Sequence, residues 1–431
     1  MYKSNLFFLL FTFCFALAFS QPSPSFNPID TVFGLSSQTA TQATNIPYGS
    51  ADRQIFHLFL PDTVGTYPLV IFIHGGGFTG GNPGTVFKKS DRIEEVKYFL
   101  DNGIAYASVG YQVIEEFLPD SVGVIKCLND AKRALQFIRY YANELHINPQ
   151  QIGLIGTSAG AGTSVWLATH DDMAEPNSPD PISQQSTRVC AVVAGGSQST
   201  YDIYKWETQI YQDFDGQGTN FTLDSIAEIM SFFRLSNFYG GMDSLYEMVA
   251  NPDLIQYREE VDMLGHMSSD DPPLFIYSQS GAVHPSDDVL HHSLHGLELQ
   301  RTAIAAGISE VKAFIPTQSI ETTDGEDGMQ FLLRNLTSCA TATSVGSEVN
   351  GSNASVKIYP NPARGYFSVD WSNNQIEEVA VYSFTGKLMK HLEDLSTSSL
   401  TLSTTSLPAG MYIVHVQNQA GDTLSKKLRL E

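Results

Sequence analysis

Apolar residues occur in the first three quarters of the chain as short unbroken blocks, with amphipathic stretches between them. Such blocks are typical of strands that are buried on both faces of a parallel sheet. The stretches between them carry apolar positions at helical spacing. Because strand and helix alternate, we expect a doubly wound, mostly parallel α/β sheet. The predicted strands are residues 54–60, 69–73, 104–109, 152–155, 189–194, 274–277 and 311–315, and the predicted helices are 92–100, 123–145, 161–169 and 291–306.

The pattern changes to an alternation of apolar and polar residues from residue 355 onward. Short alternating segments with turns between them predict a small all-β sandwich. The stretch before them is rich in Ser, Thr, Gly and Asn, which is typical of a linker. We therefore predict an α/β domain at 46–338, a linker at 339–353 and a β-sandwich domain at 354–431.

The first 20 residues predict a cleaved secretory signal. Lys3 is followed by an apolar run at 6–19, with small residues at Ala16, Ala18 and Ser20. That run is short for a membrane span and ends in a processing-type sequence. We predict that residues 21–45 form a lead-in segment before the folded domain. We expect the mature chain to be exported and to contain no transmembrane segment.

Charge and cysteine content narrow the possible functions. The 46 acidic and 24 basic residues give a net charge of -22, which disfavours nucleic-acid binding. Without the signal, three cysteines remain, so at most one disulfide can form. Cys127 lies in a helical pattern and Cys190 in a strand pattern, so we expect both to be buried, unpaired thiols. We assign no catalytic role to these two or to Cys339.

Two glycine-rich motifs carry the candidate chemistry. Gly156-Thr-Ser158-Ala-Gly160 directly follows a predicted buried strand. A serine that attacks a carbonyl has to sit on a tight strand-to-helix turn, where any Cβ on the flanking positions would clash. The second motif, His74-Gly75-Gly76-Gly77, follows an earlier predicted strand. The motif around Ser158 points to a nucleophile, and the earlier glycine-rich motif points to a backbone site for negative charge.

Residues 50–337 resemble the α/β-hydrolases of the esterase and lipase group, whose oxyanion motif reads His-Gly-Gly-Gly. The resemblance implies that Ser158 is the nucleophile. It also implies that the N–H groups of Gly76 or Gly77, together with that of Ala159, stabilise the oxyanion. His74 would hold the loop in place.

The family carries an acid after the next-to-last long strand, so we look for it after residue 277. The candidates are Asp287 and Asp288, of which we prefer Asp288. The alternative is a helix N-cap formed by Ser286 and Asp287.

The family's histidine is missing from its usual place after the strand at 311–315. We assign the base to His295 or His292, from the loop that follows the strand at 274–277. Two further possibilities stay open: a weak or inactive triad, or an unusual base such as Asp324 or Glu326. The full set of substitute histidines is His284, His291, His292 and His295.

The same histidines could instead bind a metal. His291 and His295 stand one helical turn apart, and Asp288 precedes His291 by three residues, which is a spacing that can bind zinc. Solvated or helix-capping histidines are commoner. We therefore assign no metal ligand and expect no cofactor.

Residues 197–271 hold many aromatic side chains in helical and loop patterns. We expect an insertion that covers the active face and shapes a substrate pocket. The alternative is a set of plain packing helices.

The C-terminal segment resembles the sorting domain of the type IX secretion system of Bacteroidetes. The matching stretches are Ile358–Pro362, Gly365–Phe367, Tyr382–Lys387, Leu407–Ile413 and Lys426–Leu428. The resemblance implies export across the outer membrane, with the secretion machinery as partner, and a secreted or cell-surface location. A carbohydrate-binding module is the competing idea, but only Trp371 stands out as an exposed aromatic.

Together these features predict a secreted serine hydrolase that acts on carboxylic esters, either small molecules or esters linked to polysaccharides. The first alternative is a hydrolase-like protein with an incomplete triad that binds a ligand without efficient catalysis. A peptidase of the same fold is a third possibility.

Overall fold

The computed structural model describes most of the chain. The described residues are 24–35, 39–114, 120, 122–212, 226, 252–282, 287–345, 356–361, 363–371, 375–383, 388–393, 395–405, 407–408, 410–419 and 423–430. The predicted signal at 1–20, His284 and the middle of the predicted insertion lie outside these residues.

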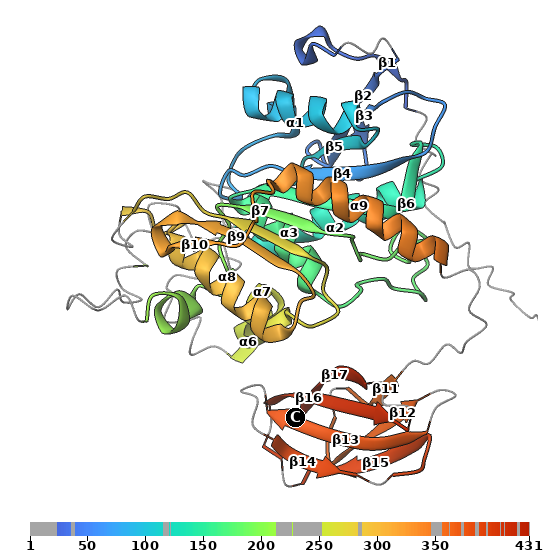
Figure 1. Cartoon of the computed structure of the whole chain (residues 1–431), viewed down its shortest axis with the longest axis vertical. Helices are drawn as coiled ribbons and strands as arrows, with labels where there is room; N and C mark the ends of the chain where they lie inside the picture. Colours follow the sequence, from blue (N-terminus) through green and yellow to red (C-terminus); the bar gives the residue numbers. More distant parts are fainter. Residues whose placement is uncertain are drawn as a thin grey trace, which may run out of the picture. The chain divides into compact units, whose positions relative to one another are not determined.

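One sheet of ten strands forms the centre of the N-terminal unit (Figure 1). Its spatial order is β1-β2-β3-β5-β4-β6-β7-β8-β9-β10. The six strands from β5 to β9 run parallel, while β1, β2, β3 and β10 pair antiparallel at the edges. This confirms the predicted mostly parallel α/β sheet. The strands are β1 Asn27–Pro28, β2 Thr41–Pro47, β3 Ile55–Leu60, β4 Tyr67–Ile73, β5 Ala105–Val109, β6 Ile147–Thr157, β7 Val192–Gly195, β8 Leu274–Tyr277, β9 Val311–Ile315 and β10 Ile320–Glu321.

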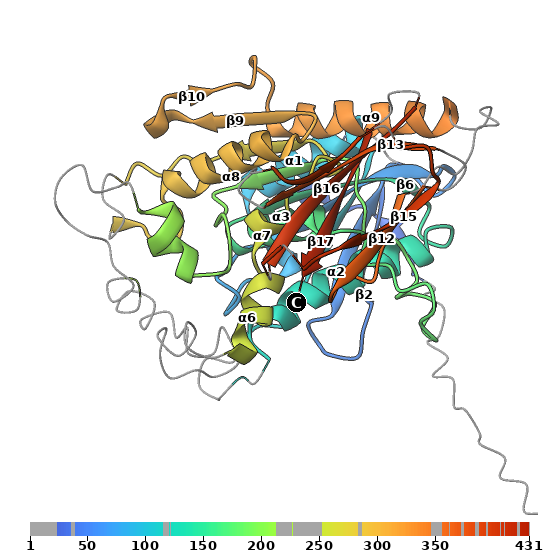
Figure 2. The ribbon, with the colours of Figure 1, turned by 90° about the horizontal axis from the view of Figure 1, so that it is seen from below.

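Helices cover both faces of the sheet (Figure 2). Helices α1 Ser90–Asp101 and α9 Gly328–Val345 pack on one face through buried side chains such as Phe99 and Phe331. Helices α2 Val124–Tyr140, α3 Ala159–Thr169 and α8 Ser293–Ala306 share the second core, which contains Trp166 and Leu299. Central strands such as β4 are therefore buried on both faces, which explains their continuous apolar sequence. The shorter elements are η1 Thr31–Phe33, η2 Pro83–Phe87, η3 Trp206–Ile210, α6 Pro252–Glu260, α7 Met263–His266 and η6 Pro316–Gln318.

The structure departs from the sequence prediction at the N-terminal side of the sheet. Strand β2 begins at Thr41, inside the segment predicted as a lead-in. It buries Ala43 and Ile46 in the core and pairs with β3, so it is part of the sheet. Its polar Thr, Gln and Asn residues hid the strand, because a strand near the edge of a sheet needs only a few apolar positions.

The C-terminal unit consists of two small antiparallel sheets that enclose one core around Phe367, Trp371 and Val414. Trp371 is therefore buried and is not an exposed aromatic platform. The arrangement is consistent with the predicted sandwich. The sheets are β11 Val356–Tyr359, β12 Tyr366–Trp371 and β15 Ser399–Ser403, and β14 Leu388–Leu392, β13 Ile376–Ser383, β16 Gly410–Asn418 and β17 Thr423–Leu430.

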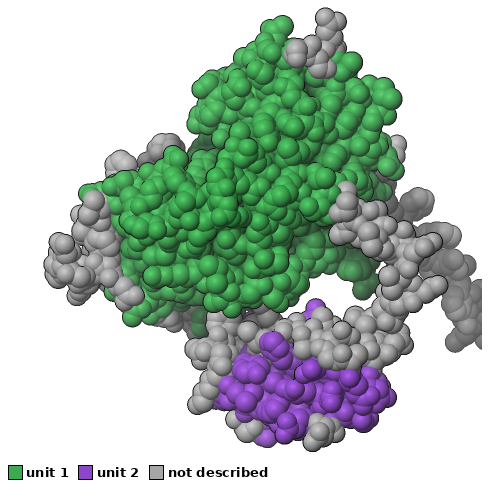
Figure 3. Space-filling model, viewed as in Figure 1, with its two compact units in different colours: residues 1–344 green, residues 345–431 purple. Residues whose placement is uncertain are grey.

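The chain divides into a unit at 1–344 and a unit at 345–431 (Figure 3). Helix α9 continues to Val345 and so occupies the first residues of the segment predicted as a linker. Among the described residues, no helix has both the length and the apolar character needed to cross a bilayer.

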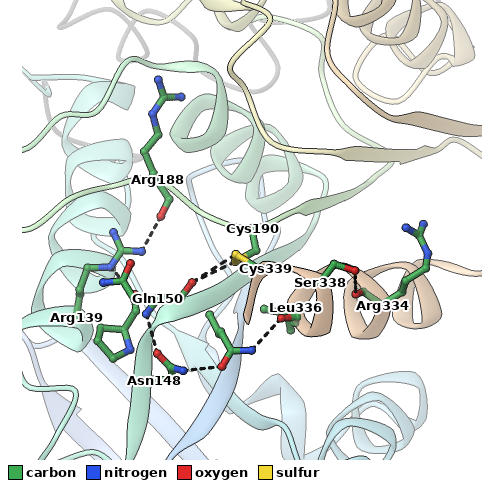
Figure 4. The surroundings of a disulfide bond; sticks show 11 residues. Arg139, Asn148, Gln150, Arg188, Cys190, Arg334, Leu336, Ser338 and Cys339 are labelled. Carbon is green, nitrogen blue, oxygen red and sulfur yellow. Dashed lines mark hydrogen bonds between the residues drawn. A yellow bond between two sulfur atoms is a disulfide. The ribbon is translucent and has the colours of Figure 1, made fainter. Parts of the chain in front are cut away.

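A disulfide joins Cys190, just before β7, to Cys339 in α9 (Figure 4). The prediction that Cys190 is an unpaired thiol is therefore wrong. Strand periodicity indicated burial, but it carried no information on which distant helix passes beside the strand. Nearby, the side-chain amide of Gln151 donates to the carbonyl of Leu336 at 2.9 Å, so α9 is attached to the sheet twice. Cys127 is buried and free, as expected.

Candidate active site

Ser158 occupies the sharp turn between β6 and α3. Its backbone has φ 55° and ψ -125°, a conformation that non-glycine residues rarely adopt. A Cβ on Gly156 would lie 2.3 Å from the carbonyl oxygen of Gly160, and a Cβ on Gly160 would lie 2.0 Å from that of Ile73. Only glycine fits at these two positions, so the local sequence dictates the strained turn that presents the hydroxyl.

The glycine loop after β4 packs directly against this turn. A Cβ on Gly75 would lie 3.1 Å from the Cβ of Ser158. Gly76 and Gly77 have φ values of 126° and 60° and are exposed. Among the described residues, the N–H groups of Gly76, Gly77 and Ala159 make no hydrogen bond within the protein. These donors are therefore available beside Ser158.

His74 packs beside the glycine loop and contacts its backbone. Its ring stacks on Tyr111 with centroids 4.3 Å apart, and its Nδ1 donates to the carbonyl of Gly75 at 2.8 Å. The Tyr111 hydroxyl in turn donates to the carbonyl of His74 at 2.8 Å. Burial lowers the pKa of His74 to about 4, so the ring is neutral at pH 7. These contacts place His74 against the glycine loop, and its loop-holding role stays a prediction.

His291 is the histidine that the fold brings to Ser158. Its Nε2 lies 2.8 Å from the Ser158 Oγ, and its Nδ1 lies 3.1 Å from the Asp288 Oδ1. A carboxylate only accepts hydrogen bonds, so Nδ1 carries the proton and Nε2 has a lone pair for the serine hydroxyl. The resulting chain Ser158–His291–Asp288 is an arrangement that can remove a proton from a nucleophile.

Asp288 is itself held in place by neighbouring groups. Its Oδ1 also accepts from the backbone N–H of His291 at 3.1 Å, and its Oδ2 accepts from the hydroxyl of Ser280 at 2.9 Å. Asp287 is exposed. Of the two predicted acids, the geometry therefore favours Asp288.

The structure does not bring the two histidines assigned to the base, His292 and His295, to Ser158. The His292 side chain accepts from the N–H of Leu294 and caps α8. His295 is completely buried, and its two ring nitrogens contact Ser199, Val289 and Tyr211. The available sequence signal was the Asp288-x-x-His291 spacing, which fits a single turn before α8. His284 lies outside the described residues.

The two acidic residues considered as unusual bases are both engaged in ion pairs. Asp324 pairs with Lys312, and Glu326 pairs with Arg334. The spacing that suggested a zinc site does not produce one, because His291 and His295 belong to separate hydrogen-bonded groups. In the described part of the chain, no cluster of three or more His, Cys, Asp or Glu residues is arranged to hold a metal ion.

Comparison with protein families adds two matches, both in the expected order. Residues 56–237, which include most of β3, the strands β4 to β7, the glycine loop and Ser158, match the family described as BD-FAE. The chain carries a BD-FAE domain. That family consists of esterase-type α/β-hydrolases, so the domain is an esterase-type hydrolase domain. The match ends before the loop that carries Asp288 and His291.

Residues 357–431 match the secretion system C-terminal sorting domain. This match confirms the predicted type IX sorting domain and indicates export by that machinery to the cell surface or beyond it. The BD-FAE domain therefore belongs to an exported protein.

Several solved structures resemble the chain at low identity. A truncated carbohydrate esterase from gut microbiota is 16% identical, with a TM-score of 0.49 over 71% of this chain and 99% of that one. A bifunctional GH43-CE protein of Bacteroides eggerthii is also 16% identical, with a TM-score of 0.48 over 69% of this chain and 38% of that one. An acetyl ester-xyloside bifunctional hydrolase of Caldicellulosiruptor lactoaceticus is 19% identical, with a TM-score of 0.42 over 75% and 97% of the two chains. A search of curated proteins found no match.

Proposed function

We propose that the protein is a secreted serine hydrolase of carboxylic esters, with Ser158 as nucleophile, His291 as general base and Asp288 as the acid that orients His291. The 2.8 Å contact between the Ser158 Oγ and the His291 Nε2 carries this proposal. A candidate base has to reach the proton it removes, and this distance lies within that reach.

The first half of the reaction makes an acyl-enzyme. As the Ser158 Oγ bonds to the ester carbonyl carbon, its proton moves to the His291 Nε2, and the carbonyl oxygen becomes an oxyanion. Asp288 stabilises the imidazolium through Nδ1. When the oxyanion collapses, the bond from the carbon to the leaving oxygen breaks, and that oxygen takes the proton from Nε2 and departs as an alcohol.

The second half releases the acid and restores the site. A water molecule gives a proton to the His291 Nε2 while its oxygen bonds to the acyl carbon. Collapse of the second oxyanion breaks the bond to the Ser158 Oγ, which takes the proton back, and the free carboxylic acid leaves.

The oxyanion is proposed to lie between the N–H groups of Gly76 or Gly77 and that of Ala159. Each pre-aimed donor lowers such a barrier by about 3 to 4 kcal/mol. The exposed loop positions and the absence of internal acceptors for these N–H groups among the described residues support this role.

The substrate is proposed to be an ester that the protein meets outside the cell, including acyl groups such as acetyl or feruloyl carried by polysaccharides. Export by the sorting domain supports an extracellular substrate, because a polymer does not have to enter the cell to be cleaved. Comparing rates on p-nitrophenyl acetate, acetylated xylan and methyl ferulate tests this choice.

The catalytic assignment is tested by steady-state hydrolysis of p-nitrophenyl acetate. Ser158→Ala and His291→Asn are expected to lower kcat by about 10⁴-fold or more, since members of such a unit act together. His292→Asn is the matched control, because asparagine preserves the N-cap of α8 and leaves His291 in place. A wild-type protein no faster than Ser158→Ala would show that the esterase proposal is wrong. A fully active His291→Asn would reject His291 as the base.

A further inference from the structure

His295 lies one turn after His291, at the start of α8, yet it points into a separate buried group. Its Nδ1 lies 3.3 Å from the backbone nitrogen of Ser199 and 3.0 Å from the Ser199 Oγ. Its Nε2 lies 3.0 Å from the carbonyl oxygen of Val289 and 3.0 Å from the Tyr211 hydroxyl. The imidazole therefore links the segment before η3 to the loop that carries His291.

The direction of these hydrogen bonds follows from their partners. A carbonyl oxygen only accepts, so the Nε2 of His295 carries the proton that it shares with Val289. Nδ1 then accepts from the N–H and hydroxyl of Ser199. Burial lowers the pKa of His295 to about 3, so this neutral tautomer persists at working pH.

Both residues that separate Asp288 from His291 are held by side chains from the segment at 197–211. The Tyr211 hydroxyl donates to the carbonyl of Val289 at 2.7 Å, and the Gln198 side-chain amide donates to the carbonyl of Leu290 at 2.6 Å. Tyr211, Gln198 and Val289 are buried, so water competes little for these bonds.

The same segment also contacts the serine turn. The Tyr201 hydroxyl donates to the carbonyl of Ala159 at 2.8 Å. Gly195, the last residue of β7 and just before this segment, accepts from the N–H of Ser158 at 2.9 Å. Residues 195–211 therefore reach both the turn that presents Ser158 and the loop that presents His291. A nucleophile and its base have to be held within about 0.5 Å of their productive geometry. A segment that supports both the Ser158 turn and the His291 loop therefore helps to maintain that geometry.

We propose that His295 is a positioning residue, which together with Tyr211 and Gln198 fixes the loop at 288–291 so that His291 stays within reach of Ser158. This role rests on the proposed function, because it matters only if His291 acts as the base. His295 does not itself touch the reacting atoms.

The test uses Tyr211→Phe, which keeps the ring and removes only the hydroxyl, in the full chain with p-nitrophenyl acetate. The expected result is a fall in kcat of about 10- to 100-fold, as for a small misplacement of a catalytic group. KM should stay within about twofold, because the loop positions the base rather than the ester. Attack by Ser158 should be slower in this variant, so a fluorophosphonate should also label Ser158 more slowly than in the wild type.

The control is Tyr67→Phe. Tyr67 starts β4, at the end of the strand opposite the glycine loop, and its hydroxyl bonds to Asp62. Both variants lose one tyrosine hydroxyl, but only Tyr211→Phe should lower kcat. A second comparison uses His295→Gln and His295→Leu. Glutamine keeps a donor and an acceptor and leucine keeps neither, so kcat should fall less in His295→Gln than in His295→Leu. Near-UV circular dichroism confirms that each variant is folded.

The outcomes separate the two proposals. An active wild type with an unchanged kcat in Tyr211→Phe would overturn the positioning role alone. Equal kcat losses in Tyr211→Phe and Tyr67→Phe would overturn it as well, since they would indicate general loosening. A wild type without Ser158-dependent turnover would overturn the esterase proposal and this role with it.

Discussion

At the scale of single residues, the site joins a strained serine to a histidine 133 positions later in the chain. Each partner is held by something different: Ser158 by glycines on either side, and His291 by Asp288 and the buried bonds behind its loop. Ser158 is therefore held by close backbone contacts around its turn, whereas His291 is held by a carboxylate three residues earlier and by bonds from the segment at 197–211.

The acid can be tested with a pair of neighbouring carboxylates. Asp288→Asn is expected to lower kcat on p-nitrophenyl acetate by about 10⁴-fold, because an amide cannot fix the required His291 tautomer. Asp287→Asn should retain nearly full activity, since Asp287 is exposed and does not hold His291. Equal losses in the two variants would argue against the assignment.

The buried histidines make stability depend on pH. Burial lowers the pKa of His57 and His74 to about 4 and that of His295 to about 3. The unfolded chain binds these protons near pH 6.5 and the folded chain does not, so stability is complete above pH 6.5 and falls as the pH is lowered toward 4. Each histidine contributes at most about 1.4 kcal/mol per pH unit in that window.

Urea unfolding at pH 7, 6 and 5 measures this effect. The free energy of unfolding should fall steadily across the series. His57→Phe should make the fall shallower, because one of the three protonation sites is gone. A free energy that does not change between pH 7 and pH 5 would contradict the predicted burial of neutral histidines.

Single residues of the candidate site show which features could be predicted from the sequence and which could not. Gly156, Gly160 and the glycine loop were predictable because their motifs require glycine where the backbone approaches closely, whether from the same turn, as at Gly156, or from β4, as at Gly160. The choice among His291, His292 and His295 was harder, because the Asp288-x-x-His291 spacing was the one local signal, and the direction of each ring depends on the turn before α8 and on the first residues of that helix. One points to Ser158, one caps the helix and one enters the core.

At the scale of elements, the sheet and helices largely follow the hydrophobic pattern. Most predicted strands match β3 to β9, and the predicted helices match α1, α3 and α8, to within a few residues. The exceptions are β6, which begins at Ile147 instead of residue 152, and α2, which ends at Tyr140 instead of continuing to residue 145. Helix α9, Gly328–Val345, was not predicted. Buried blocks of one residue class predict elements well, whereas β2, with its mixed composition, was missed.

The disulfide that attaches α9 to the sheet is predicted to stabilise the N-terminal unit. The disulfide between Cys190 and Cys339 closes a loop of 149 residues, and removing such a link costs about 3 to 5 kcal/mol. Cys339→Ala should lower the urea midpoint of the N-terminal unit by a corresponding amount. Dithiothreitol should lower the wild-type midpoint and leave that of the variant unchanged. A wild-type midpoint that is insensitive to reduction would contradict a stabilising disulfide.

At the scale of the whole molecule, the protein combines an esterase-type domain with a domain that directs its export. The two units have separate hydrophobic cores, with no residue shared between them among those that the structure describes. The proposed catalytic residues all lie in the first unit, which ends with α9.

A chain that ends at Val345 should therefore keep its activity. Its kcat/KM on p-nitrophenyl acetate is expected to stay within about twofold of the full chain, because independent domains carry their own cores. Secretion, measured as the share of protein outside the cells, should be lost. A truncated chain that folds but loses turnover would show that the sorting domain takes part in catalysis.

The central claim is that Ser158 is activated by His291, and covalent labelling tests it most directly. Purified protein is treated with a fluorophosphonate at pH 7, and the modified residue is located by peptide mass spectrometry. We expect a single adduct on Ser158, formed rapidly in the wild type and in His292→Asn, and at least about 10³-fold more slowly in His291→Asn. A wild type that does not label, or a His291→Asn protein that labels as fast as the wild type, would contradict the claim.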